Sequence, residues 1–177
     1  MQGVKARTSL SFNLKLTLEQ IRGHREAYLA DENGMGWERE AMEAGRKLAA
    51  GDFSRDNLLV IVRWKSPRSL GHIKSNKSCE ISDSLRLALD AKTPRAAMAV
   101  LCGLRGVEVP MASAILTAIK PARYTVIDRR ALKTLGTKQL TPTINNYLDY
   151  LRFCDAKAKE LDIPLRDLDH ALWQAGA

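Results

Sequence analysis

The stretch from Thr93 to Gly136 constrains the fold more than any other part of the chain, because residues that start and end helices follow one another closely in it. Thr93 followed by Pro94 is typical of a helix start, since a threonine side chain accepts hydrogen bonds from free backbone amides and proline suits the first helical position. Gly106 tolerates the left-handed conformation that ends many helices, and Pro110 starts another helix. The sequence therefore predicts two helices joined by a tight turn.

A single acidic residue follows this pair of helices, at the start of a third one. Pro121 ends the second helix, residues 124–127 form a short apolar run of extended character, and Asp128 precedes the helical pattern of residues 129–136. An aspartate in that position caps the helix, because its carboxylate accepts hydrogen bonds from the amides of the first turn. The same amides favour the ionised form, so we expect a carboxylate that stays negative near neutral pH.

Apolar residues recur at helical spacing through the rest of the chain. The continuous apolar run of residues 58–62 suits either a buried strand or a buried helix, and we favour the helix because no second convincing strand exists to pair with it. We expect loops at residues 31–36 and 65–78, and a loose arm or a short edge strand at residues 1–13. The sequence predicts an all-α chain that folds as a single compact domain over residues 1–177. The expected helices outside the central stretch span residues 17–29, 37–49, 54–65, 81–89, 141–161 and 164–174.

The composition favours a basic cytoplasmic protein. The formal net charge is +8 at pH 7, which suggests a polyanionic partner, although a basic protein with no such partner has the same composition. Cys79, Cys102 and Cys154 are odd in number and widely spaced, so we expect no disulfide framework and no metal site, as in a reducing cytosol. No apolar run reaches membrane-spanning length, and the N-terminus lacks a signal-peptide core. We therefore expect a cytoplasmic monomer that is not inserted in a membrane.

Residues 65–78 form the segment with the most one-sided charge, since they include basic residues and no acid. Such a loop either grips DNA phosphates while its tip enters the duplex where a base has been displaced, or is a solvated surface loop, and we favour the first interpretation. Trp64 stands just before this segment, and it either stacks on an extruded base or packs in the core. His72 lies within the segment. The basic residues are Lys65, Arg68, Lys74 and Lys77.

Several other residues receive structural roles. Trp37 is expected on the inner side of its helix, although it is also, with Tyr28, a weaker candidate for stacking on a base. Asp167 and Asp169 are expected to be acids on the surface of the last helix. His170 shows no metal-ligand spacing with the other histidines, so we expect a packing or surface position for it.

The central stretch resembles a known family of DNA-repair enzymes. Leu104, Gly106, Val107 and Ala112 match a helix-hairpin-helix pattern, and Asp128 follows at the expected distance, after a proline and a short extended piece. On these residues the chain resembles the helix-hairpin-helix DNA glycosylase superfamily, which includes endonuclease III, the adenine glycosylase MutY and the 8-oxoguanine glycosylases. The match covers about a quarter of the chain.

This resemblance implies an all-α monofunctional DNA glycosylase that acts on double-stranded DNA. It implies that Asp128 assists hydrolysis of the bond between a flipped base and its deoxyribose, which leaves an abasic site and needs no cofactor. Arg129 and Arg130 are then expected beside the flipped nucleotide, and Trp64 and His72 in the base pocket. The hairpin residues expected to bind a DNA phosphate are Arg105, Gly106, Val107 and Val109.

Two departures from the family pattern shape this prediction. Glu108 stands where the family has a second hairpin glycine, and a carboxylate beside a phosphate is repulsive, so either its side chain points away or the DNA contact is altered. Pro110 stands nearest to the nucleophilic lysine of bifunctional members, and proline has no amine that forms a Schiff base. The substrate base stays open, as does the choice between base-excision repair and defence against phage DNA with modified bases. The alternatives are a non-catalytic helix-hairpin-helix module that binds DNA or a protein, and a helical interaction protein unrelated to nucleic acids.

Overall fold

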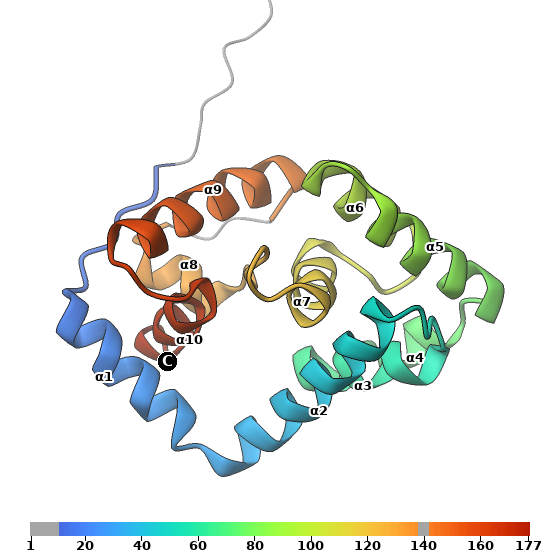
Figure 1. Ribbon diagram of the computed structural model, residues 1–177, viewed down its shortest axis with the longest axis horizontal. Coiled ribbons are helices and arrows are strands. Elements are labelled where there is room, and N and C mark those ends of the chain that lie inside the picture. The colour runs from blue at the N-terminus through green and yellow to red at the C-terminus, as the bar shows by residue number, and fades with distance from the viewer. Residues whose placement is uncertain (1–10, 138–141) are drawn as a thin grey trace, which may run out of the picture.

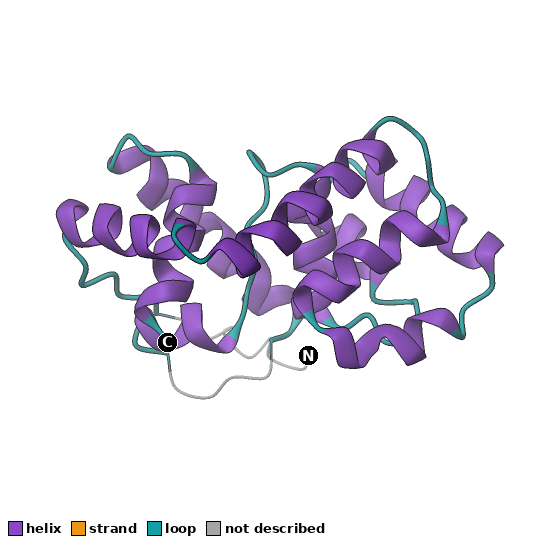
Figure 2. Ribbon diagram, turned by 90° about the horizontal axis from the view of Figure 1, so that it is seen from below, coloured by secondary structure: helices purple, strands orange, loops and turns teal. Residues whose placement is uncertain are grey.

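A computed structural model describes residues 11–137 and 142–177 of the chain. Within these ranges the secondary structure is helical, and Figure 2 shows no strand among the residues that it describes. This confirms the predicted all-α class. The helices are α1 (Leu18–Leu29), α2 (Glu32–Ala49), α3 (Arg55–Lys65), the 3-10 helix η1 (Pro67–Ser69), α4 (Leu70–Lys74), α5 (Ser78–Asp90), α6 (Pro94–Leu101), α7 (Val109–Ile119), α8 (Arg129–Thr134), α9 (Ile144–Glu160) and α10 (Leu165–Ala175).

Side-chain caps fix several helix starts where the sequence predicts them. The Thr17 hydroxyl accepts a hydrogen bond from the Gln20 N–H at 3.2 Å, and the Gln20 side chain accepts one from the Thr17 N–H at 2.9 Å, which completes a capping box on α1. Thr93 caps α6 by accepting from the Ala96 N–H at 3.2 Å. Each cap satisfies a first-turn amide that has no partner within its helix.

Helix α7 lies at the centre of the fold, surrounded by the other helices (Figure 1). All of its residues except Pro110 are buried, and it packs against α2, α3 and α6. The contact with α2 is very close, because a Cβ atom placed on Gly45 would lie only 2.0 Å from the carbonyl oxygen of Ala118. A larger residue at position 45 would push these two helices apart. The central helix thereby fixes the turn before it and the extended residues 124–127 after it.

Two segments that were expected to be loops contain helix. Residues 32–36 form the first turns of α2, because Asp31 caps this helix by accepting a hydrogen bond from the Gly34 N–H at 3.2 Å. The packing of the following turns outweighs the low helix propensity of the glycines in this segment. Residues 67–74 fold into η1 and α4, since Ile73 is fully buried in the core and holds the segment against it.

Other helix boundaries and orientations are confirmed or corrected. The apolar run of residues 58–62 lies in α3, which confirms the buried helix over the buried strand. Helix α5 begins at Ser78 and is longer than predicted, and α9 begins at Ile144, whereas residue 141, the predicted start, lies outside the described residues. Trp37 was expected to face inward, but it is 46% exposed, because the buried face of α2 turns its Ala41 side to the core.

The chain before α1 is only partly described. Residues 1–10 of the predicted arm lie outside the described residues, so the prediction of a loose arm or edge strand is compared with the structure only at residues 11–13. These are neither loose nor a strand, because the Asn13 N–H donates to the Leu135 carbonyl at 3.1 Å and the Phe12 ring packs edge-on against Tyr150 at 5.8 Å.

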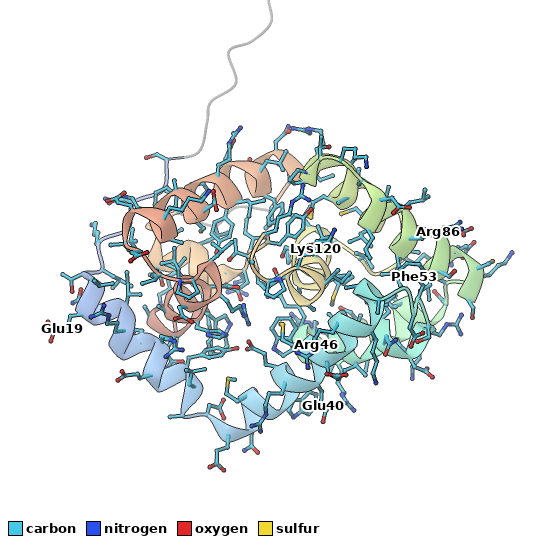
Figure 3. The ribbon with its side chains drawn as sticks, in the orientation of Figure 1. Glu19, Glu40, Arg46, Phe53, Arg86 and Lys120 are labelled. Atoms are coloured by element: carbon cyan, nitrogen blue, oxygen red, sulfur yellow. The ribbon has the colours of Figure 1, made fainter. Side chains whose placement is uncertain are left out.

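The outside of the fold is charged. Figure 3 shows side chains such as Glu19, Glu40 and Arg86 projecting outward from the peripheral helices. Within residues 11–137 and 142–177, no helix combines the length and the apolar character that a membrane crossing requires.

Candidate functional site

The candidate site is built around the extended residues 124–127, which connect α7 to α8. These residues are buried, so their backbone polar groups need partners that no helix or sheet supplies. Four buried side chains from α7, α9 and α10 supply them. The bonds are Ile127 N–H to Ser113 Oγ at 3.1 Å, Val126 N–H to Asp169 Oδ2 at 3.2 Å, Tyr150 OH to Val126 O at 3.1 Å and Tyr147 OH to Thr125 O at 3.3 Å.

Asp128 follows this fixed segment and caps α8, as the sequence predicts. Its Oδ1 accepts a hydrogen bond from the Ala131 N–H at 3.0 Å. Its Oδ2 accepts one from the Lys65 ammonium at 3.1 Å, and the two side chains are 15% and 16% exposed, respectively. The carboxylate is therefore oriented by two donors and is still reachable from outside. The ion pair joins the last residue of α3 to the start of α8.

Two cavities meet at this ion pair. We call the first the aromatic cavity: it measures about 350 Å³, and Tyr28, Trp37, Trp64 and Trp173 lie in its wall. We call the second the basic cavity: it measures about 900 Å³ and is wide and open. Both cavities share the residues Lys65, Asp128 and Trp173 in their walls.

The aromatic rings of the first cavity pack on one another and on cations. Tyr28 stacks on His170 with 4.2 Å between ring centroids, and it meets Trp173 edge-on at 5.4 Å. The Arg166 guanidinium lies over the Trp64 ring at 5.4 Å. These contacts limit the rotation of the rings, so the cavity has a preformed shape.

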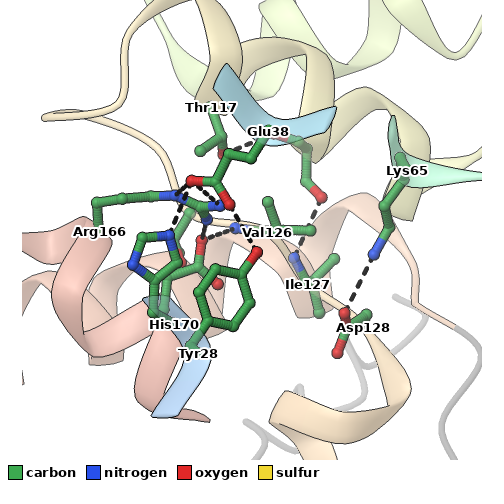
Figure 4. A network of polar contacts seen from close by, with 12 residues as sticks. Tyr28, Glu38, Lys65, Thr117, Val126, Ile127, Asp128, Arg166 and His170 are labelled. Atoms are coloured by element: carbon green, nitrogen blue, oxygen red, sulfur yellow. Dashed lines mark hydrogen bonds and ion pairs between the residues drawn. The ribbon is translucent and has the colours of Figure 1, made fainter. Parts of the chain in front are cut away.

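A buried charge network lies behind this aromatic wall (Figure 4). Glu38 accepts hydrogen bonds from the Tyr28 hydroxyl at 2.6 Å and from His170 Nε2 at 2.8 Å, and it pairs with Arg166 Nη2 at 2.8 Å. Burial alone would raise the pKa of Glu38, but the His170 hydrogen bond, the Arg166 charge and the Tyr28 hydrogen bond lower it to about 2. Arg166 also pairs with Asp169. Burial raises the pKa of Asp169, and the positive charge of Arg166 opposes that effect.

The basic cavity lies next to the turn between α6 and α7. Gly106 in this turn has a φ of 80°, the left-handed conformation that the sequence predicts. Asn76 is 5% exposed and holds the turn, because its Oδ1 accepts from the Arg105 N–H at 2.9 Å and its Nδ2 donates to the Arg105 carbonyl at 3.0 Å. Glu108 lines the cavity with an exposed side chain that does not cap α7. Across the cavity, the Arg130 guanidinium lies 4.0 Å from the Trp173 ring centroid.

The structure brings most of the predicted site residues together. Trp64 is partly buried: it packs against the core, as one of the two alternatives predicts, and it also lines the aromatic cavity with Lys65 and Asp128. His72, which was expected near Trp64, lines the basic cavity and not the aromatic one, because α4 places it beside Gly106. The predicted residues in the wall of the basic cavity are Lys65, Arg68, His72, Gly106, Asp128, Arg129 and Arg130.

Five predicted DNA-contact residues lie outside both cavity walls. The side chains of Val107 and Val109 are buried in the core, and the Val107 N–H already donates to the Leu104 carbonyl at 3.1 Å. The other three, Lys74, Lys77 and Arg105, are exposed. The basic segment is therefore divided, with Lys65 and Arg68 in the site and its later lysines outside it.

Sequence reasoning missed the buried charged residues of the site. Asp169, expected on the surface, is 3% exposed, and Glu38 was not singled out at all. Arg166 and His170 complete the same network. A signal for Asp169 existed, because it stands four residues after Leu165 and three before Leu172, and both of these leucines are buried on one face of α10.

No protein-family model matches this chain, and no curated protein or solved structure is significantly similar to it. The roles of its residues therefore rest on the geometry above. In the part of the chain that the structure describes, no group of three or more histidine, cysteine, aspartate or glutamate side chains is arranged to hold a metal ion.

Proposed function

We propose that this chain is a monofunctional DNA glycosylase, which hydrolyses the N-glycosidic bond of a damaged or modified base flipped out of double-stranded DNA. The observation that carries the proposal is the position of the Asp128 carboxylate, in the wall that the aromatic cavity and the basic cavity share. A flipped nucleotide places its base in one space and its phosphates in another, with the sugar between them. In this proposal the sugar lies beside Asp128, between the two cavities.

The chemistry needs a negative group at this place. Breaking the bond between base and deoxyribose builds positive charge on the sugar, and a carboxylate fixed nearby stabilises that charge or orients the attacking water. Asp128 is held at the start of α8 by the Ala131 N–H, so little reorganisation is needed when the charge develops. A DNA phosphate is an alternative partner for the Lys65 ammonium, and such an exchange would leave the Asp128 charge free to act on the sugar.

The two cavities suit the two parts of a nucleotide. The volume of the aromatic cavity, about 350 Å³, lies in the range of small-molecule sites, and the exposed face of an aromatic ring binds the flat face of a base. The cations Arg68, Arg129 and Arg130 of the basic cavity suit phosphates, and the fixed turn at Gly106 supplies backbone amides beside them. This arrangement supports a helix-hairpin-helix type of DNA contact.

A non-catalytic DNA-binding module of the helix-hairpin-helix type is the second candidate. Glu108 favours it, because this exposed carboxylate lies in the basic cavity beside the turn and repels a phosphate there. A module of this kind would bind DNA weakly and would release no base.

The test is an abasic-site assay on duplexes that contain damaged, methylated, uracil or glucosylated-cytosine bases. We expect the wild-type protein to form abasic product from at least one duplex, and Asp128→Asn to lose roughly a hundredfold or more of that activity. Asparagine also caps helices, so this variant keeps the start of α8. The matched control is Asp155→Asn, which removes an exposed carboxylate of α9 that pairs with Lys159.

The outcomes separate the candidate functions. Full activity in Asp128→Asn would exclude the proposed catalytic residue, and absence of product from every duplex would leave the binding module. DNA binding by either candidate should weaken steeply with salt, because neutralised phosphates release counterions. A protein that binds no duplex at low salt would be neither, and the choice between repair and phage defence then no longer arises.

A further inference from the structure

Asp169 lies in the wall of the aromatic cavity, together with Asp31 and Asp128. It is only 3% exposed, and its Oδ2 accepts a hydrogen bond from the Val126 N–H at 3.2 Å and pairs with Arg166. Its Oδ1 receives no hydrogen bond from any described residue, and it is not one of the unpartnered side-chain atoms that are sealed from solvent. Oδ1 therefore opens into the cavity that the residue lines.

The hydrogen-bond donors around Asp169 are already used. Arg166 directs Nη1 at Asp169 and directs Nε and Nη2 at Glu38, and the Tyr28 hydroxyl also donates to Glu38. His170 Nε2 faces the same Glu38 carboxylate at 2.8 Å. Buried polar groups in folded proteins are nearly always paired. Asp169 Oδ1 is therefore an acceptor that no donor of the described neighbouring side chains pairs with.

We propose that Asp169 Oδ1 accepts a hydrogen bond from an N–H group on the edge of a planar nitrogen heterocycle bound in the aromatic cavity. The aromatic rings bind the face of any flat ring, whereas the carboxylate selects its edge. If a carbonyl oxygen of the ring faced Oδ1, two hydrogen-bond acceptors would face each other with no donor between them. In a site shielded from water, this arrangement is strongly unfavourable. This assignment rests on the proposed glycosylase function: the heterocycle is then the flipped base, and Asp169 determines which base is accepted.

The same side chain ties the bound ring to the reaction site. Val126, which Oδ2 holds, lies two residues before Asp128 in a segment whose other backbone groups are also fixed. A ring bound at Oδ1 is therefore set at a constant distance from the Asp128 carboxylate. This geometry lets one residue read the base and fix its sugar relative to Asp128.

The test measures binding of free bases, which needs no catalysis. The probes are adenine, cytosine and uracil carrying a methyl group at the glycosidic nitrogen, each compared with a counterpart whose exocyclic amino group is dimethylated or whose ring N–H is methylated. Tryptophan fluorescence reports binding, because three tryptophans line the cavity. We expect at least one parent base to bind roughly tenfold or more tightly than its methylated counterpart, as a hydrogen bond to a charged acceptor requires.

Two variants locate this discrimination. In Asp169→Asn the parent base and its methylated counterpart should bind with the same affinity. If the methyl groups were excluded only by their size, the affinity difference would persist in that variant. Asp167→Asn is the matched control, because it removes a partly exposed carboxylate of the same helix that pairs with Arg25, and it should keep the affinity difference. A wild-type protein that shows no affinity difference, or binds no base, overturns the proposal, as does an unchanged affinity difference in Asp169→Asn.

A second measurement covers a variant that fails to fold. In a crystal of the wild-type protein soaked with the tightest parent base, a ring nitrogen or amino nitrogen within hydrogen-bond distance of Oδ1 supports the proposal. A base bound elsewhere, or turned so that a carbonyl faces Oδ1, overturns it. If the protein prefers the parent base over its methylated counterpart but forms abasic product from no duplex, the glycosylase function is excluded and a heterocycle-binding site remains. Failure of the Asp169 proposal and failure of the glycosylase proposal are therefore distinguishable.

Discussion

Replacing Glu38 by glutamine tests the buried charge network directly. The variant keeps the size of the side chain, but it removes the negative charge that faces Arg166 and His170 behind the aromatic cavity. The pKa of Glu38 is lowered from its ordinary value of 4.5 to about 2 in the folded protein. A carboxylate with a lowered folded-state pKa stabilises the fold only while it is ionised.

The magnitude follows from these two pKa values. The two pKa values differ by about 2.5. Because a pKa difference of 1 corresponds to about 1.36 kcal/mol, the ionised carboxylate stabilises the fold by about 3 kcal/mol. The sign is set by the unfolded chain, which binds the proton first as the pH falls. The contribution is therefore complete above about pH 4.5 and is lost as the pH falls toward about 2.

The assay is urea unfolding of both proteins at a series of pH values. At neutral pH, Glu38→Gln should be less stable by about 3 kcal/mol, which corresponds to a melting temperature lower by roughly 6 to 12 °C. This difference should shrink steadily as the pH falls below about 4.5. Glu40→Gln is the control, because it removes an exposed carboxylate of the same helix that pairs with Arg63, and a pH-independent difference within about 1 kcal/mol is expected. A constant gap between wild type and Glu38→Gln at all pH values would refute the reasoning.

Three further predictions concern the turn, the extended segment and the reaction. Gly106→Ala should lower the free energy of unfolding, measured in urea, by about 3 kcal/mol or more and weaken DNA binding. Gly136→Ala should lower it by only about 1 kcal/mol, because Gly136 has a similar φ but no atom within 4 Å of an added Cβ. Equal losses in the two variants would contradict the expected clash at Gly106. Ser113→Ala should lower the free energy of unfolding by about 1 to 3 kcal/mol, because it leaves the buried Ile127 N–H unpaired. Ser82→Ala, on the partly exposed side of α5, should be nearly neutral in the same assay. If both variants were neutral, Ser113 would not stabilise the extended segment. Borohydride should trap no covalent adduct with DNA, because Pro110 has no amine and Lys65, the lysine in the walls of the two cavities, is paired with the Asp128 carboxylate. An adduct that disappears in Lys65→Met would disprove this.

The helical architecture was largely predictable from the sequence, because the signals that start and end helices are local. Thr17, Thr93 and Asp128 cap helices where their side chains can reach the first-turn amides, and these amides are only a few residues away. Gly106 adopts the left-handed turn for the same kind of reason. The segment at residues 32–36 was misjudged, because tertiary packing overrides the propensity of glycine and asparagine for loops.

The sequence by itself determined that this chain is helical, where its central turn lies and that a carboxylate stands at the start of α8. Only the tertiary structure decided what surrounds that carboxylate. Lys65 pairs with Asp128 from 63 residues away, and Glu38 meets His170 from 132 residues away. The physical reason is that burial and hydrogen bonds determine whether a charged group is a solvated surface residue or part of a site. Both depend on which distant helices pack together, which local periodicity does not encode.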